Sequence, residues 1–111
     1  MRLSLVSFLR NVLYAMPSDV IEVLGLSLHR HDQRAKLNGL PLALTPMEYR
    51  LIEALALQPG RIFTRAELAN HCCPNTTINE RTIDTYIKTL RRKLSGFGGK
   101  IETIRGIGYR M

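Results

Sequence analysis

The chain has 111 residues, 45% of them hydrophobic and 23% charged, a composition that fits one globular domain and excludes a wholly disordered chain. It carries a formal net charge of +7 at pH 7, and most of the excess lies between residues 79 and 111, where eight Arg and Lys stand against three acidic residues. This local positive charge favours a polyanionic partner, whereas no apolar run reaches the roughly 20 residues needed to span a membrane.

Residues 1–18 are predicted to form an amphipathic helix and a linker that precede the main domain. Apolar side chains recur at helical spacing over residues 3–16, and Pro17-Ser18-Asp19 ends the pattern. No small-residue cleavage site follows, so the segment is a poor signal peptide. An isolated helix of this length is marginal in water, and we expect it to pack on the domain, to pair with a second copy, or to be the remnant of a preceding domain. Residues 19–111 are predicted to form the folded domain.

Residues 20–44 are predicted to form a small antiparallel sheet of three or four strands with one buried face. The apolar period changes to two from Val20 to Leu24, where Gly25 interrupts the strand, and it continues on both sides of a turn at His31-Asp32-Gln33. Asn38-Gly39 then separates two further alternating segments. Both residues tolerate positive φ, so this dipeptide is a strong hairpin signal.

Three helices are predicted from capping boxes, in which a Thr caps the helix and a Glu three residues later bonds back to the cap. Pro46 suits the first position of the first helix, and a short extended piece, residues 61–63, separates that helix from the second. The start of the third helix lies at Thr77 or Asn79. The three boxes are Thr45 with Glu48, Thr64 with Glu67, and Thr77 with Glu80.

The third helix is predicted to have two different faces. One is aliphatic and the other carries cations and hydroxyl groups, so the helix can sit on a core and offer donors to a nucleic-acid groove. A short Gly-rich stretch, residues 96–100, leads from this helix into a basic hairpin over residues 101–110. The aliphatic face comprises Ile83, Ile87, Leu90 and Leu94, and the polar face Arg81, Thr85, Lys88 and Arg92.

A short helix, a loop, a basic helix and a hairpin, in that order, are typical of a helix-turn-helix with a β wing. The predicted fold class is therefore α+β: a winged helix-turn-helix with an N-terminal antiparallel sheet, three helices and a C-terminal hairpin. In such units the second helix of the motif lies in the major groove of duplex DNA. The sequence thus predicts a domain whose basic helix binds duplex DNA.

The candidate DNA-binding residues lie on the basic helix and at the tip of the hairpin. Arg and Lys can read guanine edges, and a Thr methyl group can contact thymine. Arg81 and Arg91 lie nearer the flanks, where they would hold phosphates. Arg105 stands beside Gly106 and Gly108 at the slim tip of the hairpin, shaped to enter a minor groove. The full set is Arg81, Thr82, Thr85, Lys88, Thr89, Arg91, Arg92 and Arg105.

Other chemistry is weakly indicated. His29 and His31 share a strand face, and His71-Cys72-Cys73 adds soft ligands, but the spacing matches no standard zinc pattern. Cys72 lies at the end of an amphipathic helix, where a buried cysteine acts as a small hydrophobe. Two adjacent thiols that are poorly placed to pair fit a reducing cytoplasm. No catalytic grouping or phosphate loop stands out, so we expect no enzyme activity, no metal and no cofactor.

Five motifs together resemble the OmpR/PhoB-type winged-helix effector domain of two-component response regulators, over about residues 20–111. The resemblance implies a transcription regulator that binds duplex DNA sequence-specifically, commonly as a head-to-tail pair on direct repeats. It also implies contact with RNA polymerase through the loop at about residues 73–79. The motifs are Leu44-Thr-Pro-Met-Glu-Tyr-Arg-Leu-Ile52, Pro59-Gly-Arg-Ile-Phe-Thr-Arg-Ala-Glu-Leu68, Arg81-Thr-Ile-Asp84, Leu90-Arg-Arg-Lys-Leu94 and Ile104-Arg-Gly-Ile-Gly-Tyr-Arg110.

The chain departs from this family at three points. Cys73 stands where the family commonly has an aromatic residue, and the loop before the hairpin is short. A receiver domain needs over a hundred residues, and only 18 precede Asp19, so we expect an effector domain without its receiver and name no phosphorylation site. The alternative function is a winged-helix protein-interaction module that does not bind DNA. RNA binding is a weaker alternative, because no aromatic stacking platform is evident.

Overall fold

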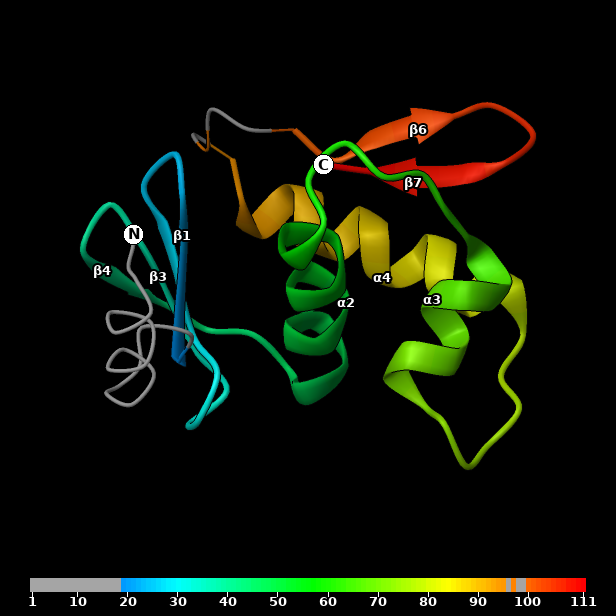
Figure 1. Cartoon of the computed structure of the whole chain (residues 1–111), viewed down its shortest axis with the longest axis horizontal. Helices are drawn as coiled ribbons and strands as arrows, with labels where there is room; N and C mark the ends of the chain where they lie inside the picture. Colours follow the sequence, from blue (N-terminus) through cyan, green and yellow to red (C-terminus); the bar gives the residue numbers. More distant parts are fainter. Residues whose placement is uncertain (1–18, 96, 98–99) are drawn as a thin grey trace, which may run out of the picture.

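The computed structural model describes residues 19–95, 97 and 100–111. The helix predicted over residues 3–16 lies outside the described residues. In the described part of the chain, no helix combines the length and apolar character that crossing a bilayer requires. Four strands come first, then three helices, and a hairpin ends the chain (Figure 1).

The N-terminal sheet has four antiparallel strands in chain order, β1 (Val20–Val23), β2 (Leu26–His29), β3 (Arg34–Leu37) and β4 (Leu40–Leu42). Its register pairs Leu26 with Leu37 and Leu28 with Ala35. These side chains share the face that turns towards the helices, and Leu26 and Leu28 have no exposed surface. The prediction of a half-buried antiparallel sheet is confirmed.

Two tight turns lie side by side at one end of this sheet. The predicted Asn38-Gly39 turn is confirmed, with φ of 53° and 84° at the two residues. Leu24-Gly25 forms a second turn of the same kind, with φ of 48° and 88°, so β1 ends at Val23 and not at Leu24 as predicted. Positive φ is rare for a leucine, which is why the sequence did not indicate this turn. The Asn38 amide donates to the Gly25 carbonyl at 2.8 Å and links the two turns.

The three helices are α2 (Pro46–Leu57), α3 (Arg65–Cys72) and α4 (Glu80–Lys93). Both reciprocal bonds of the capping box are present at the start of α2 and at the start of α3, as predicted. The third predicted box is wrong. Asn79 caps α4, and its side-chain oxygen accepts from the Arg81 amide at 2.8 Å. Glu80 is therefore the first helical residue and not the third, too early to bond back to the cap.

The core lies where the sheet, α2, α3 and α4 meet. Figure 1 shows α2 between the N-terminal sheet and α3, with α4 crossing behind it. The fully buried aliphatic side chains interlock there, and their burial is the main stabilising contribution in a domain of this size. They include Leu51, Ile52 and Leu55 of α2, Leu68 of α3, and Ile83, Ile87 and Leu90 of α4.

The C-terminal sheet has three strands in the order β5 (Phe63–Thr64), β7 (Gly108–Arg110) and β6 (Glu102–Ile104). The sequence predicted the hairpin and the extended piece but not their pairing. Gly108 allows that pairing, because a Cβ atom at this position would lie 1.8 Å from the Phe63 carbonyl oxygen. Strand β7 of the hairpin is thereby held against the segment that leads into α3.

Candidate nucleic-acid interface

Helix α4 separates an apolar face from a cationic one, as predicted. Ile83, Ile87 and Leu90 have no exposed surface, which fixes the roll of the helix on the core. The opposite side is therefore presented to solvent. Of the predicted residues on α4, Arg81, Thr85, Lys88, Arg91 and Arg92 are exposed, and Thr82 and Thr89 are half-buried.

The hydroxyl groups of two threonines on this face bond back to their own helix. Thr85 Oγ1 donates to the Arg81 carbonyl at 3.2 Å, and Thr89 Oγ1 donates to the Thr85 carbonyl at 2.7 Å. A hydroxyl that is already donating to the backbone has less capacity to read a base edge. The methyl groups then remain for apolar contact, which suits the predicted encounter with thymine.

The cationic side chains of α3, α4 and the wing tip differ in whether they form ion pairs within the protein. Arg65 of α3 and Lys93 of α4 form ion pairs within the protein. By contrast, the side chains of Arg81, Lys88, Arg92 and Arg105 form no ion pair or hydrogen bond with the residues that the structure describes. Side chains without a protein partner keep their full donor capacity for an external anion.

Arg91 differs from the other predicted site residues, because its guanidinium group faces the base of the wing. Nε and Nη2 donate to the Ile101 carbonyl at 3.1 and 2.7 Å, and Nη2 also donates to Thr103 Oγ1 at 2.6 Å. The group lies 5.6 Å from the centre of the Tyr109 ring. No sequence pattern indicated these contacts, since they join residues that meet only in the folded chain.

The wing is the β6–β7 hairpin, and Arg105 lies at its tip. The Ile107 amide donates to the Ile104 carbonyl at 2.9 Å, which closes the turn, and Gly106 has a φ of +78°. Arg105 is exposed, and Ile107 beside it is 52% exposed. The structure therefore presents one cation and one aliphatic side chain on a narrow projection, with α4 below it (Figure 1).

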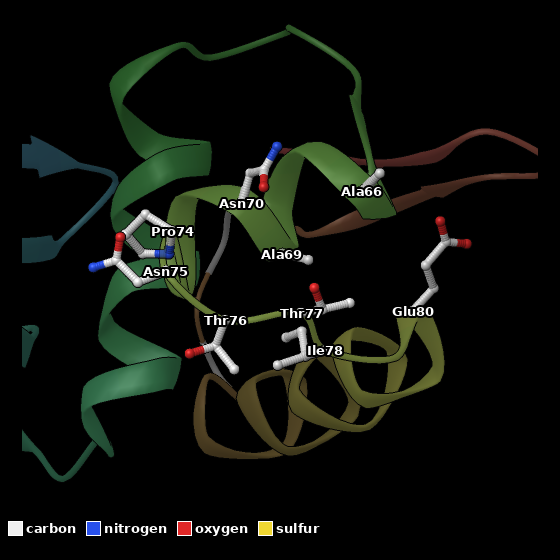
Figure 2. Close-up of a pocket in the computed structure, with 9 residues that line it drawn as sticks. All are labelled: Ala66, Ala69, Asn70, Pro74, Asn75, Thr76, Thr77, Ile78 and Glu80. Carbon is white, nitrogen blue, oxygen red and sulfur yellow. The ribbon is translucent and has the colours of Figure 1, made fainter.

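A second surface feature is the hollow between α3 and the loop that leads to α4. Figure 2 shows this loop opposite α3, with Ala69 and Ile78 near the middle of the hollow. The volume is about 510 Å³, and the lining mixes amide, hydroxyl and aliphatic groups. The residues are Ala66, Ala69 and Asn70 of α3, Pro74, Asn75, Thr76, Thr77 and Ile78 of the loop, and Glu80 of α4.

The two cysteines lie beside this loop. Cys72 is 2% exposed, and burial together with the neighbouring Cys73 raises the pKa of its thiol to about 12. Its predicted role as a small buried hydrophobe is confirmed. Cys73 is half-buried, with its sulfur 3.4 Å from Met47 Sδ. In the described part of the chain, no three His, Cys, Asp or Glu residues are grouped as metal ligands would be.

A three-helix unit whose last helix exposes unpaired cations, followed by a wing with a cation at its tip, defines a winged-helix DNA-binding domain. Residues 39–111 match the family described as transcriptional regulatory protein, C terminal. The chain belongs to this family, the OmpR/PhoB-type DNA-binding domains of response regulators.

Individual relatives agree with this assignment. The chain is 37% identical over 95 residues to the phosphate regulon transcriptional regulatory protein PhoB of Klebsiella pneumoniae, covering 83% of this chain and 42% of PhoB. The response regulator AdeR DNA-binding domain, solved in complex with an intercistronic region, gives a TM-score of 0.73 at 34% identity, covering 81% of this chain and 96% of that one. The Klebsiella pneumoniae RstA DNA-binding domain, solved in complex with the RstA box, gives 0.72 at 26% identity, covering 83% and 95%. The chain spans half or less of the curated relatives' length.

Proposed function

We propose that residues 19–111 bind duplex DNA sequence-specifically, with α4 in the major groove and Arg105 of the wing in the minor groove. The observation that carries the proposal is the set of exposed cations on α4 and the wing tip that have no partner among the described residues. Phosphate neutralisation by such cations supplies much of the affinity of a DNA-binding protein. The DNA complexes of AdeR and RstA add support from relatives of the same fold.

The residues on α4 divide by what their chemistry can recognise. Lys88 and Arg92 are assigned to base edges, because both are exposed near the middle and end of the cationic face. The methyl groups of Thr82, Thr85 and Thr89 are assigned to apolar contact, which the back-bonded hydroxyls of the last two favour. Arg81 and Arg91 are assigned to phosphates, Arg91 through the donor capacity that its bonds to the wing leave over.

The loop over residues 73–79 is the proposed contact with RNA polymerase. It borders the hollow of Figure 2, on the far side of α3 from the wing, so a protein bound there need not compete with DNA for α4. The family resemblance further supports a head-to-tail pair of domains on direct repeats. The protein is assigned to the cytoplasm, where a transcription regulator meets its DNA.

Selection of bound sites from a random duplex pool tests the DNA-binding proposal, followed by mobility-shift titrations at two salt concentrations. We expect one recovered sequence, repeated at a fixed spacing, and an affinity that falls steeply with salt. The variant Lys88→Ala should bind more weakly, whereas the matched control Lys36→Ala, which removes an exposed cation from β3, should not. No shift at micromolar protein in low salt would overturn the proposal and support the protein-interaction module.

A further inference from the structure

One carboxylate joins three elements of the domain. Asp84 Oδ1 accepts a hydrogen bond from the Tyr109 hydroxyl of β7 at 2.6 Å, and Asp84 Oδ2 accepts from Arg65 Nη1 of α3 at 2.9 Å. Asp84 itself lies on α4, one turn after Arg81 and one turn before Lys88. Helix α4 (the proposed recognition helix), helix α3 and the wing therefore meet at the Asp84 side chain.

The position of the Asp84 carboxylate on α4 is unfavourable for DNA binding. Asp84 is half-exposed on a helix that otherwise offers cations to a polyanion, and like charges repel across such an interface. Both of its oxygens are occupied by protein donors. Through these bonds Asp84 connects elements of the protein, and this structural role offsets its repulsion of the DNA phosphates.

The Tyr109 hydroxyl is a stable hydrogen-bond donor to Asp84. The residue is 7% exposed, and burial, followed by the bond to Asp84, raises the pKa of its phenol to about 12, so the hydroxyl stays protonated and donating. The wing is also attached through Arg91, which donates to Ile101 and Thr103, and Thr103 lies directly opposite Tyr109 in the β6–β7 register. Asp84 and Arg91 are two helical turns apart, about 10 Å along α4. Two attachments at this spacing resist rotation of the hairpin as well as translation.

Apolar packing does not fill the space around the first attachment. A hollow of about 200 Å³ lies between α4 and the wing, lined by Arg65 and Asp84 on one side and by wing residues such as Ile104 and Ile107 on the other. Where side chains do not interlock, directional hydrogen bonds determine the relative position of two elements. The Asp84–Tyr109 hydrogen bond, 2.6 Å long, spans this gap.

We propose that Asp84 is a positioning residue that fixes the wing relative to α4, so that Arg105 and Lys88 engage the two grooves of one duplex together. This inference rests on the proposed function. Holding the wing in place before binding avoids ordering it on the DNA, and preorganisation of this kind strengthens binding without adding a contact.

The test is a thermodynamic cycle built on Arg105. The wing effect is the factor by which Arg105→Ala weakens binding to the selected site, and it is measured with Asp84 present and in the Asp84→Ala background. We expect a wing effect of roughly tenfold to fall below about threefold, while discrimination at the base read by Lys88 persists. An undiminished wing effect would overturn the inference.

Two further variants distinguish a positioning role of Asp84 from a general effect of its negative charge and from a loss of folding. Glu102→Ala also removes one carboxylate from the chain, but Glu102 pairs with Arg110 inside the hairpin and should leave the wing effect unchanged. Tyr109→Phe keeps the ring and removes only the hydroxyl, so it should reduce the wing effect in a fully folded protein. An equal reduction by Glu102→Ala would count against Asp84.

A measurement without DNA decides the inference even where Arg105 proves to have no effect on binding. Residual dipolar couplings of the backbone amides report the orientation of β6 and β7 relative to α4. In Asp84→Ala we expect the couplings of the two units to require different alignments or reduced order. Couplings that still fit the orientation of the unaltered protein would refute the positioning role. Absence of any wing effect in the unaltered protein would instead refute the minor-groove assignment of Arg105.

Discussion

Lys93 Nζ lies 2.7 Å from Glu48 Oε1, and this contact ties the end of the recognition helix to the start of α2. Glu48 is 2% exposed, and the same oxygen accepts from the Thr45 amide at 2.9 Å. One buried carboxylate therefore closes the capping box of α2 and anchors α4. The position of the cationic face depends on this ion pair as well as on the aliphatic side chains beneath it.

Replacing Lys93 with Met should destabilise the domain, because it leaves a buried carboxylate without its counter-charge. We expect a loss of roughly 2 kcal/mol in the free energy of unfolding, less than for a fully buried pair since Lys93 is partly exposed. Urea denaturation followed by circular dichroism measures it. The variant Glu102→Ala, which breaks an exposed pair, should lose much less stability than Lys93→Met. Equal stabilities of Lys93→Met and the unaltered protein would show that the pair contributes nothing net.

The same ion pair predicts how stability depends on pH. Burial raises the pKa of Glu48, but the hydrogen bonds from Lys93 and the Thr45 amide lower it by more than burial raises it. The net pKa therefore lies below the ordinary value of 4.5. A carboxyl whose pKa is lower in the folded state stabilises the fold above the unfolded pKa, and that stability is lost as pH falls through the folded pKa. The stability difference between the unaltered protein and Lys93→Met should therefore shrink as the pH falls from neutral to below 4.5, the ordinary pKa of a glutamate carboxyl. A constant difference over that range would exclude Glu48 as its source.

Gly108 and Gly106 should respond differently to alanine, although both lie in the wing. A Cβ atom on Gly108 would meet the Phe63 carbonyl oxygen, so Gly108→Ala must separate β5 from β7. Gly106 has open space around it, and alanine there bears only the strain of a φ of +78°, about 1 kcal/mol. Thermal unfolding should show the larger loss for Gly108→Ala, together with faster exchange of the amides in β5 and β7. The opposite order would contradict the close approach of the two strands.

The sequence predicted what is encoded locally. The capping boxes at Thr45 and Thr64 and the Asn38-Gly39 turn each depend on residues within four positions of one another, and all three are confirmed. The cationic and aliphatic faces of α4 follow from the helical period alone. Local patterns of this kind were sufficient for the fold class and for the helix that carries the candidate site.

Features that depend on distant contacts were not predicted. The sequence leaves the start of α4 open because Thr77 and Asn79 are both good caps, and the structure has Asn79 as the cap. The contacts of Arg91 with the wing depend on how the hairpin folds back over α4, and the pairing of β5 with β7 joins segments far apart in the chain. The sequence predicts Gly108 as part of a slim hairpin tip. In the structure, its lack of a side chain allows the Phe63 carbonyl oxygen to lie close to its backbone.

Arg105 should contribute most on sites whose minor groove is narrow. A narrow A·T-rich groove has an enhanced negative potential, and Arg105 is exposed at the wing tip with no partner among the described residues. Arg105→Ala should therefore weaken binding by roughly tenfold where an A-tract flanks the selected site, and by less than about threefold where a G·C-rich flank replaces it. Fluorescence anisotropy on the two duplexes measures both. Lys88→Ala serves as the comparison, because loss of a residue that reads a base edge should relax preference at one position irrespective of the flank. An equal loss on both duplexes for Arg105→Ala would assign this arginine to phosphate instead of the minor groove.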